Sequence, residues 1–283
     1  MGGEGARSAR RLLTIAVLSA AIASVANLAG GIVFHSRILV INGLTCVANL
    51  VTAVVGSEYY IRSLQPPDAD HPLGHAGYGF SSAAFTLIVY AFVLGLGIDE
   101  VANPTPYRVS GFAWTVPAGV AALYTASVLA SRRVGGAAKV YADVTTSEIA
   151  ESLVALVVTP LAHSYGYLVD RAGALAMLLY LAYQVASNTR GLLYELSLPS
   201  PPKSLVDSIR RDLSAMGYEV RDIRLRTVGP QVAGYAVVLM PPRESVEEAH
   251  RRADEIERFV KLKYNVDLVV HVEPREPKET LNR

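Results

Sequence analysis

The chain has 283 residues, of which 51% are hydrophobic and 18% are charged, and its formal net charge is +1. The near-neutral charge gives no basis for a nucleic-acid partner. The single cysteine, Cys46, excludes an internal disulfide and a thiolate cluster. Charges are scarce in the first two thirds of the chain and frequent in the last third. We therefore expect a helical membrane domain at 1–198, a small soluble domain at 203–276 and a flexible tail at 277–283.

Six apolar segments predict transmembrane helices, because each has the roughly 20 residues that a helix needs to cross the hydrocarbon core. Two adjacent glycines in the first segment, Gly30 and Gly31, are expected to allow a neighbouring helix to pack closely. The predicted spans are Leu12–Phe34, Ile38–Ile61, Tyr78–Ile98, Val109–Leu129, Val140–His163 and Leu168–Leu193.

The basic residues between the spans predict the orientation. Most of them fall on the side that holds the N-terminus and the charged last third, whereas the opposite side also carries Asp99, Glu100 and Asp170. The positive-inside rule then places both termini in the cytoplasm, as an even number of spans requires. We expect a multi-pass protein of the plasma membrane.

A short polar segment, Ser63–His75, joins the second and third spans with the sequence SLQPPDADHPLGH. Carboxylates and imidazoles are common ligands of divalent metals. We therefore expect Asp68, His71 and His75 to bind a metal ion, with Asp70 as an additional carboxylate. The alternative is that the two aspartates only cap or solvate the loop.

Two glutamates, Glu148 and Glu151, lie about two turns inside the fifth span. Ionisable residues within a span are costly, so they are candidates for a functional site by default. Asp143 opens the same span, where a carboxylate can simply favour the start of a helix.

The second span has a polar face that complements these glutamates. Asn42, Cys46 and Asn49 recur at helical spacing, and Thr45 borders them. If this face meets the fifth span, oxygen ligands from the two helices would converge around a cation. The alternative is that the amides and hydroxyls only hydrogen-bond neighbouring helices.

The last third predicts a two-layer domain of helices and a sheet. The order α-β-β-α-β is typical of an α+β, ferredoxin-like fold. The predicted elements are a helix at Lys203–Met216, strands at Val220–Val228 and Val232–Met240, a helix at Glu244–Tyr264 and a strand at Val266–Val272.

Together, these features resemble the cation diffusion facilitators. The resemblance covers nearly the whole chain and rests on six spans, the Ser63–His75 motif, the αββαβ domain, and the pairs Ala249-His250 and Ala253-Asp254. It implies a homodimeric, proton-coupled efflux transporter of divalent metal cations such as Zn, Mn, Fe, Mg or Co. The implied partners are the transported ion, protons and membrane lipid. In the soluble domain the resemblance implies metal binding by His250, His271 and Glu273.

The chain departs from the family where the family carries its transport carboxylates. Counted back from the loop, the family's Asp-x-x-x-Asp pair on the second span falls on Thr45 and Asn49. These uncharged oxygen donors favour a harder ion such as Mg²⁺ or Mn²⁺ over Zn²⁺. No histidine lies near this site to carry the exchanged proton.

The register of the fifth span stays open between three alignments. Counted from Asp143, the family's pair falls on Thr146 and Ala150, and counted from Asp170 its second member moves to Glu148. The pair at i and i+4 that contains a carboxylate is Ser147 and Glu151. The expected transport-site residues are therefore Thr45, Asn49, Ser147, Glu148 and Glu151.

Two rival classes remain beside a transporter. A non-transporting or regulatory relative would keep the loop metal site and lose the membrane site. An enzyme is not expected, because the sequence offers no nucleophile–base pair and no phosphate-binding loop.

Overall fold

The computed structural model describes residues 3–63, 65–132, 137–228 and 231–275. They form two compact units, Met1–Ile61 with Ser81–Arg190, and Arg62–Phe80 with Gly191–Arg283. The turn predicted at Gly229-Pro230 and the tail predicted at 277–283 lie outside the described residues.

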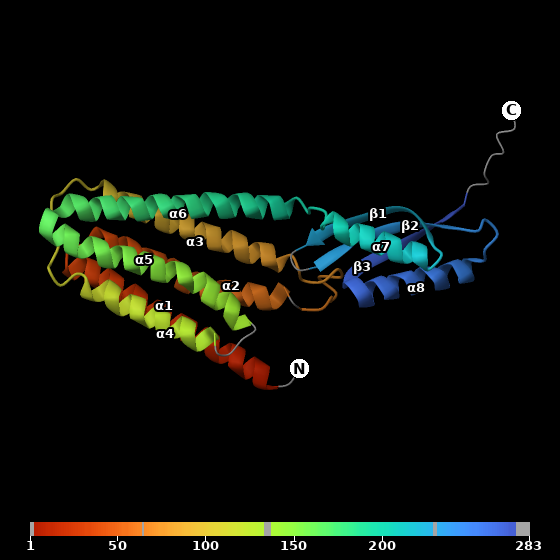
Figure 1. The fold of residues 1–283 in the computed structure, drawn as a ribbon, viewed down its shortest axis with the longest axis horizontal. Coiled ribbons are helices and arrows are strands. Elements are labelled where there is room, and N and C mark those ends of the chain that lie inside the picture. The colour runs from red at the N-terminus through yellow and green to blue at the C-terminus, as the bar shows by residue number, and fades with distance from the viewer. Residues whose placement is uncertain (1–2, 64, 133–136, 229–230, 276–283) are drawn as a thin grey trace, which may run out of the picture. The chain divides into compact units, whose positions relative to one another are not determined.

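Long helices that run along one another build the first unit (Figure 1). Its core includes Ile38, Leu39 and Leu181, which are at most 2% exposed. Other large apolar side chains point outward, as Ile88 and Leu179 do at 67% and 64% exposure. Helices that are apolar on both sides are typical of a bundle surrounded by lipid. The helices are α1 (Gly3–Val33), α2 (Arg37–Ser63), α3 (Tyr78–Ala102), α4 (Thr115–Arg132), α5 (Ala137–Tyr165) and α6 (Tyr167–Leu196).

Three helical stretches among the described residues are long and apolar enough to cross a membrane, namely Arg37–Val55, Tyr78–Ala102 and Tyr167–Leu196. Val17–Val33 and Thr115–Leu129 are shorter apolar helices. Within the described residues, α5 contains neither kind of apolar stretch. Six helices are therefore observed, whereas six spans remain a prediction.

The predicted fourth span begins too early. Residues 103–114 form no helix, and α4 starts at Thr115. The backbone N–H of Ser110 donates instead to the carbonyl of Phe34, so this segment packs against the α1–α2 turn. Pro117 fits in the first turn of α4, where its missing N–H costs nothing.

The close-packing role predicted for the two glycines of α1 is confirmed. A Cβ atom on Gly30 would lie 2.7 Å from a methyl group of Val116, and one on Gly31 would lie 2.6 Å from a methyl group of Val40. Side chains at these positions would push α4 and α2 away from α1.

The second unit contains a three-stranded sheet in the order β1-β2-β3. The β1 and β2 strands pair antiparallel, whereas β2 and β3 pair parallel. The buried residues Ile209 and Leu213 of α7 and Ile256 and Val260 of α8 belong to the same apolar core as the sheet. The predicted α-β-β-α-β order is confirmed, and the ferredoxin-like fold stays a prediction. The elements are α7 (Lys203–Ala215), β1 (Glu219–Val228), β2 (Gln231–Met240), α8 (Val246–Tyr264) and β3 (Val266–Pro274).

Candidate metal centres

Two carboxylates lie buried inside the helical unit. Glu148 and Glu151 of α5 are only 6% and 8% exposed, and one helical turn separates them, so they project in similar directions. Burying two acidic groups in an apolar bundle is costly unless a cation, protons or hydrogen-bond donors compensate them.

The polar face of α2 supplies such donors. The Thr45 hydroxyl donates to Glu151 Oε2 at 2.9 Å, and the Asn49 side-chain amide donates to Glu148 Oε1. The two predicted faces therefore meet, with two carboxylates of α5 opposite a hydroxyl and an amide of α2. Ser147, which precedes Glu148 in the sequence, is half-buried.

The structure also bears on the open register of α5. Glu148 and Glu151 both face α2, whereas Ala150 is exposed. The side chains of Asp143 and Thr146 lie outside the described residues. Because both carboxylates reach α2, the cluster can carry up to two negative charges, which matches the charge of a divalent cation.

Two residues of this cluster, Asn27 and Tyr124, were not predicted from the sequence. Asn27 of α1 donates to Cys46 Sγ at 3.7 Å, and Tyr124 of α4 donates to the same sulfur at 3.5 Å. The thiol in turn lies 3.8 Å from Glu148 Oε2. The available signal was an asparagine inside an apolar span, but no spacing rule links it to α2.

A second group of candidate ligands lies in the segment between α2 and α3. One ligand atom each from Asp68, His71 and His75 lies within 4.8 Å of the others. His75 Nε2 is 3.2 Å from Asp68 Oδ2, and His71 Nδ1 is 3.5 Å from Asp68 Oδ1. Two imidazoles and a carboxylate suit a divalent metal of borderline softness.

The backbone of the loop prepares these ligands. Asp68 Oδ1 accepts hydrogen bonds from the N–H groups of His71 at 2.7 Å and Asp70 at 3.0 Å. The bond from His71 is the main reason that the pKa of Asp68 is lowered, so the carboxylate is ready as an anion. His75 Nδ1 lies 3.0 Å from the carbonyl oxygen of Pro66. Since a carbonyl can only accept, Nδ1 carries the proton and Nε2 is left with a lone pair for a metal.

Other predicted ligands do not join these groups. Asp70 is exposed and is absent from the loop's set of three. His250 lies 3.7 Å from Asp254 on α8, and His271 lies 3.7 Å from Glu273 on β3. In the described part of the chain, these residues of the soluble domain form no cluster of three metal-ligating groups.

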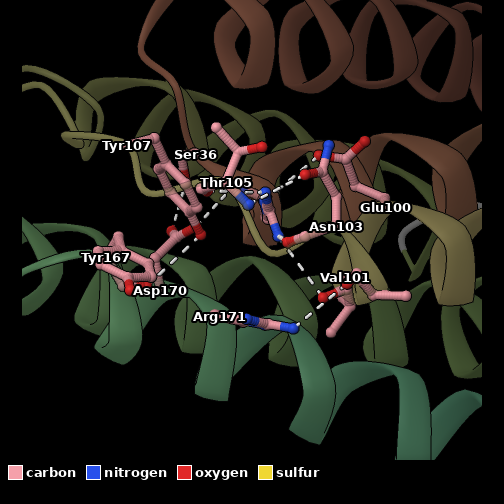
Figure 2. A network of polar contacts seen from close by, with 11 residues as sticks. Ser36, Glu100, Val101, Asn103, Thr105, Tyr107, Tyr167, Asp170 and Arg171 are labelled. Carbon is pink, nitrogen blue, oxygen red and sulfur yellow. Dashed lines mark hydrogen bonds and ion pairs between the residues drawn. The ribbon is translucent and has the colours of Figure 1, made fainter.

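A second buried polar network lies where α2 and α6 begin, and Figure 2 shows it from close by. Asp170 of α6 is fully buried and accepts from the Ser36 hydroxyl at 2.7 Å and the Arg37 backbone N–H at 2.6 Å. The Tyr107 hydroxyl also donates to it, at 2.8 Å. Burial, together with the charge of Asp170, raises the pKa of Tyr107, so its hydroxyl remains a donor. Asp170 thus caps a helix to which it does not belong.

The Arg37 guanidinium completes this network. It donates to the carbonyls of Asn103 at 2.5 Å and Thr105 at 3.3 Å. It also lies 3.7 Å from Glu100 and 4.6 Å from the centre of the Tyr107 ring. The start of α2, the end of α3 and the segment after it are therefore tied together.

Comparison with known proteins identifies the family. A family model described as the cation efflux transmembrane domain matches residues 13–197. The chain belongs to the cation diffusion facilitator family. A second model, the cytoplasmic domain of cation efflux proteins, matches residues 201–275. The soluble domain of this facilitator is thus its cytoplasmic, dimer-forming domain.

Two proteins of Bacillus subtilis (strain 168) are similar to this facilitator over nearly their whole length. The uncharacterized transporter YdbO is 25% identical over 284 residues, which cover 91% of this chain and 92% of that protein. The manganese efflux system protein MneS is 25% identical over 293 residues, which cover 93% and 95%. The family consists of transporters, so the chain is a membrane protein for metal cation efflux.

Proposed function

We propose that the chain exports a divalent cation, Mn²⁺ foremost, across the plasma membrane in exchange for protons. The observation that carries the proposal is the buried pair Glu148 and Glu151 opposite Thr45 and Asn49. These groups provide two carboxylates, a hydroxyl and an amide, which together suffice to replace much of a cation's hydration shell.

The ligand chemistry and one relative favour Mn²⁺ over Zn²⁺. A set made of oxygen donors suits harder ions, whereas zinc prefers nitrogen and sulfur. The relative MneS is described as a manganese efflux protein. Ser147 is proposed as a further oxygen ligand that turns inward when the cation is bound.

Proton exchange follows from the cost of buried charge. Two ionised carboxylates in an apolar bundle need compensation, which either one divalent cation or two protons can provide. A site that must always hold either the divalent cation or two protons couples the movement of the cation to that of protons, even without a histidine.

The proposed topology has six spans, with α5 crossing the membrane despite its glutamates because they face other helices. Both termini are proposed to lie in the cytoplasm. The cytoplasmic domain, proposed to be ferredoxin-like, would join two copies into a homodimer.

Flux into proteoliposomes tests this function. Purified protein in vesicles with an imposed pH gradient should move Mn²⁺, and collapsing the gradient with an ionophore should slow the flux. Zn²⁺, Fe²⁺, Mg²⁺ and Co²⁺ should be compared in the same vesicles. Flux of all five ions at the level of empty vesicles would exclude transport.

The loop group is proposed as a separate cytoplasmic metal site that regulates transport. Replacing both Asp68 and His75 by alanine should remove one bound metal per chain, measured by elemental analysis of purified protein. Mn²⁺ should still bind at the membrane site. If the double variant loses all bound metal and the wild type shows no flux, the chain is a non-transporting metal-binding relative instead. The variant His250→Ala in the soluble domain is the control. It should leave the metal content of the loop unchanged, because His250 is exposed on α8.

A further inference from the structure

The polar face of α2 extends beyond the two residues that contact the carboxylates. Asn42, Thr45, Asn49 and Thr52 recur every three or four residues, so they share one face of the helix. At 1.5 Å per residue this stripe is about 15 Å long, which is about half of the hydrocarbon core. Its length exceeds what a single cation site requires.

The ends of the stripe differ from its middle. Thr45 and Asn49 donate to the two glutamates. At the ends, Asn42 Oδ1 and Thr52 Oγ1 are buried atoms without a hydrogen-bond partner. A buried polar atom without a partner is unfavourable, so oxygens on both sides of the carboxylates are left able to accept a ligand.

Asn27 of α1 fixes the orientation of Asn42. The Asn42 amide donates through Nδ2 to Asn27 Oδ1 at 3.4 Å, and both residues are fully buried. The Nδ2 of Asn27 is directed to the thiol of Cys46, which in turn contacts Glu148. Asn42 therefore uses its donor on α1 and keeps its oxygen atom unpaired. Amides that only joined two helices would be expected to use both groups.

We propose that Asn42, held by Asn27, is a transfer ligand that receives the transported cation as it leaves Glu148 and Glu151. This inference rests on the proposed function. An amide oxygen is a hard and uncharged ligand, so it binds a divalent cation without holding it as a carboxylate does. Passage through a membrane requires sites that are favourable to enter and weak enough to leave. The glutamates make the site favourable for the cation to enter, and Asn42 is a ligand weak enough for the cation to leave.

The test separates transfer from binding. Asn42→Leu has a similar volume and removes the oxygen. We expect its maximal Mn²⁺ flux in proteoliposomes to fall by about 10- to 100-fold. Mn²⁺ affinity of the purified protein, measured by equilibrium binding, should change by less than about threefold. Asn42→Asp keeps the oxygen and adds a charge, so it should bind Mn²⁺ more tightly and still transport slowly.

Thr159→Val is the matched control. Thr159 is fully buried on α5, and its hydroxyl donates at 2.9 Å to the carbonyl of Ala155 on its own helix. This variant should transport Mn²⁺ at the wild-type rate, which shows that removing a buried polar group from the bundle is not harmful in itself.

The outcomes are distinguishable. The inference is wrong if Asn42→Leu and Asn27→Leu transport at the control rate, or if they lose affinity and flux in parallel, as loss of the site's shape would cause. If Asn42→Leu does not fold, the Asn42→Asp variant decides by the direction of its change in affinity. Absence of flux in the wild type would refute the proposed function itself, whatever the variants do.

Discussion

Helix α2 carries two buried polar networks that differ in how completely their atoms are paired. At its first residues, Asp170 accepts three hydrogen bonds, and neither it nor Ser36 or Tyr107 has a buried atom without a partner in the described part of the chain. Further along, the carboxylates are bonded, but Asn42 Oδ1 is not.

The difference separates a structural network from one that is prepared for a ligand. Fully paired groups stabilise one arrangement and have no capacity left for a further partner. A buried polar group without a partner has a free-energy cost, and an ion or water that binds to the group removes that cost. Both networks contain buried ionisable residues in or beside apolar helices, so burial alone would not distinguish them.

The largest expected effect is at the carboxylates. Glu148→Gln and Glu151→Gln should each reduce Mn²⁺ flux to the level of empty vesicles, because an amide cannot balance the charge of the cation. Thermal stability in detergent should be kept or raised, since a costly buried charge is gone. Glu58→Gln, at an exposed position of α2, is the control and should retain flux. Normal transport by both glutamine variants would refute the site.

The fully paired network around Asp170 should respond differently, because a mutation there should lower stability first. Asp170→Ala leaves two buried donors and one half-buried donor without an acceptor, so the free energy of unfolding should fall by about 3–5 kcal/mol. Denaturant titration in detergent measures this loss, and Asp170→Asn should recover part of it. An unchanged stability combined with lost flux would show that Asp170 belongs to the transport machinery and would break the comparison.

A smaller effect is expected at Tyr107. Tyr107→Phe removes one hydrogen bond to Asp170 and keeps the ring beside Arg37. Stability should fall by about 1 kcal/mol, seen as a small shift in Tm, with Mn²⁺ flux preserved. A change in flux larger than the change in stability would place this network in the transport cycle.

The sequence was informative where spacing carries the structure. The loop ligands Asp68, His71 and His75 follow one another closely, so a single turn brings them together, and Gly74 allows that turn with its φ of 87°. The meeting of Thr45 and Asn49 with the α5 glutamates was also foreseeable, because each pair shares one face of its helix.

What depended on the packing of distant helices was not predictable. Asn27 joins the cluster only because α1 lies against α2, and no pattern in its own span indicates that neighbour. From the sequence, Asp170 was recognisable only as a charge near the end of a span, and Arg37 gave no sign of being its partner. The hydrogen bond between them joins residues 133 positions apart. Its donor is a backbone N–H, so the type of residue at that position gives no sign of it.

The cap that Asp170 places on α2 has a mechanical consequence. It holds this helix at its first residue, while Asn49 lies about 18 Å further along the axis. A helix fixed at one end is a lever, so tilting it by about 5° about Arg37 displaces Asn49 by about 1.6 Å. Such a movement is enough to break the Asn49–Glu148 contact without disturbing a single bond to Asp170. The most rigid part of the helix would then be the pivot about which the cation site opens.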